Sequence, residues 1–113
     1  MSRARKKLTG RELAIVVSTA PAGGDLERGL ALARAARALG CEVGMFFMHE
    51  AVGGLAARKA TVSALADDGV LLVACATSAE ALGATAASLP CPLGSQDDHA
   101  AIVQRAERLV ALT

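Results

Sequence analysis

Cys75 occupies a position at which a thiol can do chemistry. It follows the most apolar run in the chain, Val70–Ala74, and precedes Ala76–Glu80, whose composition predicts the start of a helix. Open α/β sheets place their active sites at junctions between a buried parallel strand and a helix. Backbone N–H groups at a helix N-terminus favour the thiolate, which is the nucleophilic form of cysteine. Cys75 is therefore the candidate for covalent chemistry; the alternative is a small buried side chain that ends a strand.

The other two cysteines are weaker candidates. Cys91 lies between Pro90 and Pro92 and would serve as a resolving thiol for Cys75 if the two strand ends lie close together. Cys41 enters the second expected strand at the opposite pole of the sheet, which favours a packing role. Three cysteines cannot all pair within one chain, and the sequence shows no convincing secretion signal. We therefore expect reduced thiols in a cytoplasmic protein.

A polar tract, Gly94–His99, also falls at an expected strand-to-helix junction and so at the same edge as the first cysteine. Ser95 and Gln96 offer hydrogen-bond donors to an anionic sulfur group, and free N–H groups of the following helix point the same way. His99 would act as a proton partner or counter-charge. The alternative is helix capping by Ser95 or Asp97, with His99 exposed.

His49 follows the second expected strand, so it lies at the same edge, either as a site residue or as an ordinary surface histidine. The histidines and cysteines form no compact Cys-x-x-Cys or His-x-x-x-His pair, so no metal site is expected. Gly23-Gly24 is a weak hint of a phosphate loop, but the sequence contains neither G-x-G-x-x-G nor G-x-x-x-x-G-K-[ST]. We therefore expect no metal and no organic cofactor.

The composition limits the classes of function. The chain has 113 residues, which fits one domain, and 53% of them are hydrophobic, a little above the usual range for soluble proteins. Such a chain places surplus apolar surface in a subunit interface. The net charge is +1, and Phe46 and Phe47 are the only aromatic residues, which disfavours nucleic-acid binding and a flavin held between rings. No stretch approaches about 20 uninterrupted apolar residues, so no membrane span is expected.

The hydrophobic pattern predicts alternating strands and helices. Short apolar runs with β-branched residues indicate buried strands, and apolar positions at helical spacing indicate amphipathic helices. The order β-α-β-α-β-α-β-α predicts a parallel sheet with helices on both faces. We expect a single domain over residues 11–113 and a flexible basic tail at residues 1–10. The expected strands are residues 12–18, 41–48 and 70–74, with an edge strand or loop at 89–93. The expected helices are residues 25–39, 58–66 and 77–88, and a last one that ends near Leu112. Thr77 and Glu80 are expected to form a capping box at the start of the third helix. Ile102, Ala106 and Leu109 are expected to face inward from the last helix.

Several short motifs follow one another in a distinctive order. A Gly-Gly loop follows the first strand, Ala33-x-x-Ala36 leads to Gly40–Val43, Asp68-Gly69-Val70 precedes Cys75–Ala79, and Gly94-Ser95 precedes the last helix. In this order and spacing the chain resembles the small DsrE/DsrF-type proteins of the sulfur-relay group, which includes the TusD-like subunits. The resemblance covers residues from about 12 to 113.

This resemblance implies a flavodoxin-like, three-layer α/β/α fold with a mostly parallel sheet of four to five strands. It also implies homo-oligomers, either trimers or hexamers, and sulfur-carrier proteins as partners. The strand-end cysteine of such proteins holds sulfur as a persulfide, and that position falls on Cys75. The chain departs from the family at Ala81-Leu82, where a basic residue is common, and at the prolines around Cys91. The residues expected to bind substrate or support the cysteine are Ser78, Gly94, Ser95, Gln96, His99 and His49.

Two alternatives remain open from the sequence. The first is a non-catalytic subunit whose surface serves assembly, with Cys75 merely buried. The second is a small-ligand or nucleotide-binding module that uses the Gly23-Gly24 loop.

Overall fold

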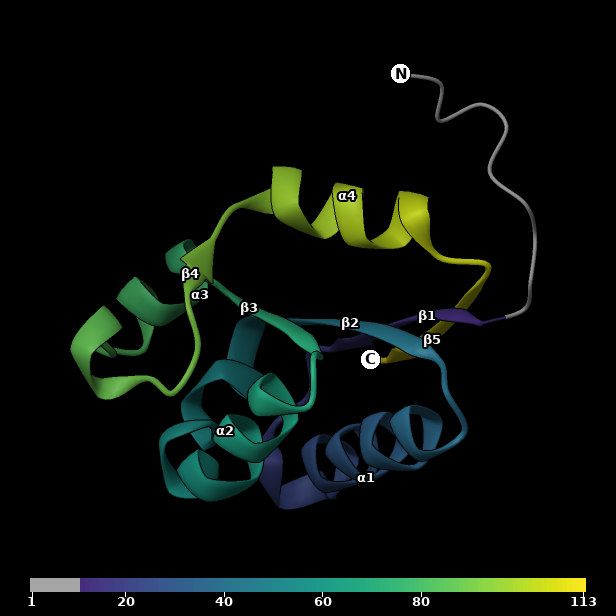
Figure 1. Ribbon diagram of the computed structural model, residues 1–113. Coiled ribbons are helices and arrows are strands. Elements are labelled where there is room, and N and C mark those ends of the chain that lie inside the picture. Colours follow the sequence, from purple (N-terminus) through teal and green to yellow (C-terminus); the bar gives the residue numbers. More distant parts are fainter. Residues whose placement is uncertain (1–10) are drawn as a thin grey trace.

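The computed structural model describes residues 11–113, and the expected basic tail, residues 1–10, lies outside the described part. One parallel sheet of five strands, in the order β4-β3-β2-β1-β5, forms the middle layer. Helices α1 and α2 cover one face and α4 covers the other (Figure 1), which confirms the predicted three-layer fold. The strands are β1 (Glu12–Val17), β2 (Glu42–Phe47), β3 (Leu71–Cys75), β4 (Leu93–Gly94) and β5 (Arg108–Leu112). The helices are α1 (Asp25–Ala38), α2 (Lys59–Asp67), α3 (Ala76–Ala81) and α4 (Gln96–Arg105), with 3-10 turns at Pro21–Gly23, His49–Gly54, Ala56–Arg58 and Ala86–Ser88.

The central strands are apolar throughout because both faces of the sheet are covered. Alternate side chains of each strand enter one of two clusters, since successive residues of a strand point to opposite faces. The larger cluster packs against α1 and α2 and contains Ile15, Met45, Phe47, Leu72 and Ala74 among others. The smaller one, here named the α4-side cluster, contains Ala14, Val16, Phe46, Val73, Cys75 and Ile102. Cys75 therefore faces α4 and not the main core.

Helix α1 lies close to the sheet. Its buried face contains Leu26, Leu30 and Ala33, as the spacing predicts. Gly29 permits the approach, because a Cβ at this position would lie 2.9 Å from Val17 Cγ2. The helix ends as predicted before Gly40, which adopts a left-handed φ of +85°.

The prediction for the C-terminus was wrong. Helix α4 ends at Arg105, and β5 follows and pairs in parallel with β1. Ile102 is buried as expected, whereas Leu109 is 51% exposed. The physical reason is the free edge of β1, whose backbone groups gain partners when the chain extends alongside it. The N–H of Glu107 donates to the carbonyl of Glu12 at 2.8 Å, and the N–H of Ser18 donates to that of Leu112 at 3.0 Å.

The helix after Cys75 was also predicted too long. It ends at Ala81, and Gly83 follows with a left-handed φ of +74°. The predicted capping box of Thr77 and Glu80 is absent, since Cys75 itself is the N-cap residue. The proline-flanked segment beyond contributes only β4, a two-residue strand at the edge of the sheet, as its prolines require. Within residues 11–113, no helix is both long enough and apolar enough to cross a membrane.

Candidate functional site

The structure places Cys75 at the carboxyl end of β3, where the chain turns directly into α3. Its partner in the neighbouring strand is Gly94, which is followed by Ser95, the N-cap residue of α4. The side chain points to the α4 side of the sheet, and the residue is only 6% exposed. Exposed residues surround it in sequence and space, namely Ala76, Thr77 and Gln96. The sulfur therefore lies just beneath the surface, at the edge that the sequence predicted.

Hydrogen-bond donors converge on the Cys75 sulfur. Burial alone raises the pKa of this thiol, because an anion is poorly solvated there. The side chain and N–H of Ser78, the N–H of Thr77 and the side-chain amide of Gln96 act in the opposite direction and outweigh burial, so the pKa lies below its ordinary value. The Gln96 Nε2 to Cys75 Sγ distance is 4.0 Å. This arrangement favours an anionic sulfur.

Ser78 is held by the backbone of a residue far away in the sequence. Its hydroxyl oxygen accepts the N–H of His49 at 2.7 Å, and the serine is buried. This contact leaves the single hydroxyl proton of Ser78 free to be donated to the sulfur. His49 adopts a left-handed φ of +53°, the only non-glycine residue to do so in the described part of the chain. Its backbone thus belongs to the site, while its side chain is exposed.

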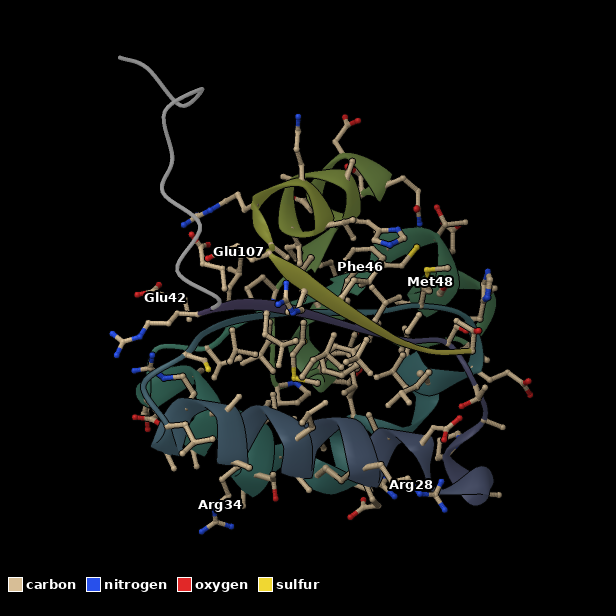
Figure 2. All side chains as sticks on the ribbon, turned by 90° about the vertical axis from the view of Figure 1, so that its right-hand side faces the viewer. Arg28, Arg34, Glu42, Phe46, Met48 and Glu107 are labelled. Carbon is tan, nitrogen blue, oxygen red and sulfur yellow. The ribbon has the colours of Figure 1, made fainter. Side chains whose placement is uncertain are left out.

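Gln96 connects the sulfur to His99. The Nδ1 atom of His99 lies 2.9 Å from Gln96 Oε1. The imidazole stacks on the ring of Phe46, with centroids 4.8 Å apart and planes within 6° of parallel. Figure 2 shows Phe46 and Met48 on the α4 side of the sheet. His99 is therefore half-buried and not exposed, and Phe46 is a site residue that the sequence pattern did not reveal.

Ser95 and Gly94 set the start of α4. The Ser95 hydroxyl accepts the N–H of Asp97 at 3.1 Å, and its own N–H donates to Asp98 Oδ2 at 2.8 Å, so Ser95 caps the helix. The capping alternative considered for Ser95 is thus the one that the structure shows. A Cβ on Gly94 would lie 2.6 Å from Val73 Cγ1 and closer still to the Asp98 carboxylate. Glycine therefore allows α4 to begin directly beside β3.

Cys91 and Cys41 lie away from this arrangement. Cys91 is buried in the cluster on the α1 and α2 side, whereas Cys75 faces α4. Burial raises the pKa of Cys91 to about 11, so it is a poor nucleophile near neutral pH. All three thiols are free, and the resolving role of Cys91 stays a prediction. Cys41 packs against the core, as expected from its position.

The loop at Gly23-Gly24 is closed by its own hydrogen bonds. The N–H groups of Gly23 and Gly24 already donate to the carbonyls of Ala20 and Pro21, so this loop does not present them to a phosphate. Over residues 11–113, no group of three or more His, Cys, Asp or Glu side chains is arranged to hold a metal ion.

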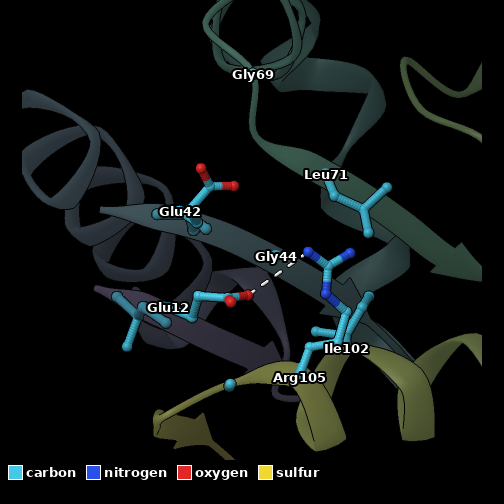
Figure 3. A pocket seen from close by; sticks show the side chains of 10 residues that line it. Glu12, Glu42, Gly44, Gly69, Leu71, Ile102 and Arg105 are labelled. Atoms are coloured by element: carbon cyan, nitrogen blue, oxygen red, sulfur yellow. Dashed lines mark ion pairs between the residues drawn. The ribbon is translucent and has the colours of Figure 1, made fainter. Parts of the chain in front are cut away.

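A separate cavity of about 280 Å³ lies at the amino ends of the strands, opposite the edge that carries Cys75. Glu12 and Glu42, which are neighbours across β1 and β2, lie on its wall. Arg105 reaches into it from α4 and pairs with Glu12 at 3.7 Å (Figure 3). No motif or spacing in the sequence indicates these three residues as a group.

Comparison with known proteins identifies the fold and the family. The sequence matches the DsrE/DsrF-like family over residues 11–112. The chain belongs to this family. No curated protein matches the sequence significantly.

Solved structures show the same fold as this DsrE/DsrF-like chain. The ychN protein from E. coli superimposes with a TM-score of 0.80 at 21% identity, covering 90% of this chain and 99% of the other. A conserved protein of unknown function from Bacteroides thetaiotaomicron gives a TM-score of 0.74 at 10% identity, covering 95% and 100%. A protein of unknown function from Methanobacterium thermoautotrophicum gives 0.63 at 18% identity, covering 88% and 96%. At these identities the likeness establishes the fold.

Proposed function

We propose that this protein carries sulfur as a persulfide on Cys75 and passes it between carrier proteins in the cytoplasm. The observation that supports this is the set of donors from Ser78, Thr77 and Gln96 around one sulfur atom at the carboxyl edge of the sheet. Donors fixed before the reaction stabilise a developing sulfur anion without reorganisation. Membership of the DsrE/DsrF-like family, generally linked to sulfur relay, agrees with this chemistry.

The transfer needs no oxidant, reductant or metal. The Cys75 thiolate attacks the terminal sulfur of a partner's persulfide; a new S–S bond forms as the partner's S–S bond breaks, and the partner leaves as a thiolate. The terminal sulfur, now on Cys75, loses its proton to solvent and is held as an anion by the donors. A thiolate on the next carrier then attacks that terminal sulfur, and Cys75 leaves as a thiolate. One S–S bond replaces another in each step, so the sulfur changes carrier at no net redox cost.

Intact mass spectrometry tests this proposal. The protein is incubated with a small-molecule persulfide donor, and the adduct is then offered to a thiol acceptor. We expect the wild type and Cys91→Ser to gain the mass of one sulfur atom and lose it to the acceptor, whereas Cys75→Ser gains none. A one-sulfur adduct that survives in Cys75→Ser would assign the chemistry to another thiol.

One observation favours a second candidate function, a non-catalytic assembly subunit. Cys75 is only 6% exposed, as a purely structural cysteine would be. If Cys75 does carry sulfur, its low exposure requires a partner to approach within van der Waals distance of Thr77 and Gln96, both of which are exposed. The two candidates differ in the expected reactivity of Cys75 in the folded protein.

A further inference from the structure

Gln96 contacts both Cys75 and His99, so it links the histidine to the sulfur. Gln96 Nε2 lies 4.0 Å from Cys75 Sγ, and the other end of the same amide, Oε1, lies 2.9 Å from His99 Nδ1. The His99 ring is in turn stacked on Phe46, whose side chain is fully buried. A rigid aromatic ring thus fixes the imidazole, and the imidazole contacts the amide.

Hydrogen-bond chemistry assigns a direction to this chain of contacts. With the Gln96 oxygen toward the imidazole, His99 donates to it as the Nδ1–H tautomer, because an amide oxygen only accepts. That hydrogen bond holds the oxygen end of the amide at the histidine and leaves the NH₂ end facing the sulfur. The reversed amide would present an oxygen to Cys75, which would repel a thiolate or a persulfide anion. The Nδ1–H tautomer of His99 therefore favours the amide orientation that suits an anion.

We propose that His99 is a positioning residue, which fixes the side chain of Gln96 so that its Nε2 donates to the sulfur anion carried by Cys75. The proposal rests on the function proposed above, because it concerns the same sulfur atom. His99 acts here through an oriented amide and not as a proton acceptor or as a direct counter-charge. The imidazole is held in place by stacking on Phe46. Its hydrogen bond to Gln96 then fixes the conformation of a side chain that would otherwise be free to rotate.

The test measures the rate at which iodoacetamide modifies Cys75 as a function of pH, with peptide mapping and no sulfur donor present. His99→Phe keeps an aromatic ring on Phe46 but removes Nδ1, and Gln96→Ala removes the amide. We expect each variant to slow modification at neutral pH roughly two- to fivefold and to move the half-maximal pH upward. Gln104→Ala, the same change on an exposed glutamine of α4, is the matched control and should leave the profile unchanged.

A double variant decides whether His99 acts through Gln96. If it does, Gln96→Ala combined with His99→Phe behaves as Gln96→Ala alone. An unchanged profile in His99→Phe would overturn the proposal. So would an equal effect of His99→Phe with and without Gln96, which would indicate direct electrostatic action. An unfolding temperature of His99→Phe close to that of the wild type confirms that the variant keeps the fold. The alkylation experiment transfers no sulfur, so a failure of the relay function would appear only in the mass experiment.

Discussion

At the scale of single residues, Cys75 is governed by two opposing effects, burial and hydrogen bonding. Burial disfavours the thiolate, whereas each hydrogen bond to a charged group contributes about 1.5–3 kcal/mol in its favour. Ser78 is the strongest of the donors, and its orientation depends on the His49 N–H that it accepts at 2.7 Å. The left-handed backbone that directs this N–H costs a non-glycine residue on the order of 1 kcal/mol. The left-handed backbone at His49 thus supports the donor arrangement that lowers the pKa of Cys75.

The first prediction concerns the reactivity of the thiols in the folded protein. Because the pKa of Cys75 is lowered and that of Cys91 is raised to about 11, Cys75 should be alkylated at a pH at which Cys91 is still protonated and unreactive. Ser78→Ala removes the stronger side-chain donor, so it should slow Cys75 alkylation at neutral pH more than Gln96→Ala does. Peptide mapping after timed alkylation from pH 6 to 10 gives both results.

The assembly candidate makes the opposite prediction for the same experiment. If Cys75 is only a packing residue, it should be protected in the native protein and react together with Cys91 when denaturant is added. Parallel modification of the two thiols would therefore argue against the relay function.

At the scale of elements, the sequence predicted what depends on local pattern. The apolar runs of β1, β2 and β3, the stop of α1 at Gly40 and the place of Cys75 between strand and helix all follow from composition and spacing. The edge shared by Cys75 and Gln96 followed from the rule that the carboxyl ends of parallel strands meet.

What could not be predicted depends on partners distant in sequence. The segment Arg108–Leu112 is apolar enough for either a helix or a strand, and the free edge of β1 decides for the strand. The contact between Ser78 and His49 depends on one left-handed residue, which no periodicity encodes. The stack of His99 on Phe46 likewise arises only once α4 lies across β2.

The second prediction concerns the junction of β4 and α4. Gly94→Ala places a methyl group 2.6 Å from Val73 Cγ1, so either the strand or the helix must shift. We expect a loss of about 1–3 kcal/mol in the free energy of unfolding, measured by urea denaturation. The displaced helix should also carry Gln96 away from Cys75 and slow its alkylation.

Gly23→Ala is the matched control for this substitution. A Cβ at Gly23 meets no atom within 4 Å, so the same change should alter stability by no more than about 0.5 kcal/mol. Equal stability of the two alanine variants would show that α4 does not depend on the close approach at Gly94.

At the scale of the whole molecule, the two edges of the sheet differ in character. The carboxyl edge holds the thiol and its donors, while the amino edge holds the cavity with Glu12, Glu42 and Arg105 (Figure 3). The two faces differ as well, because two helices cover one and the single helix α4 covers the other (Figure 1). On either side of α4 the sheet retains an exposed leucine, Leu71 on β3 at 50% and Leu109 on β5 at 51%. Apolar surface on a sheet face is typical of a subunit contact.

The last prediction is that the protein is a homo-oligomer and that β5 contributes to the contact. Leu109 lies on the α4 side of β5, which among residues 11–113 pairs with β1 alone, so it is accessible to a second copy. Burying its exposed half would contribute about 1 kcal/mol in each protomer. Light scattering after size exclusion should give a multiple of the 11.4 kDa protomer, and Leu109→Ser should shift the distribution toward smaller species. Leu39→Ser, at an exposed leucine just after α1, is the control and should leave the distribution of species unchanged. A monomeric wild type would contradict the prediction, and the relay would then be carried out by a single protomer.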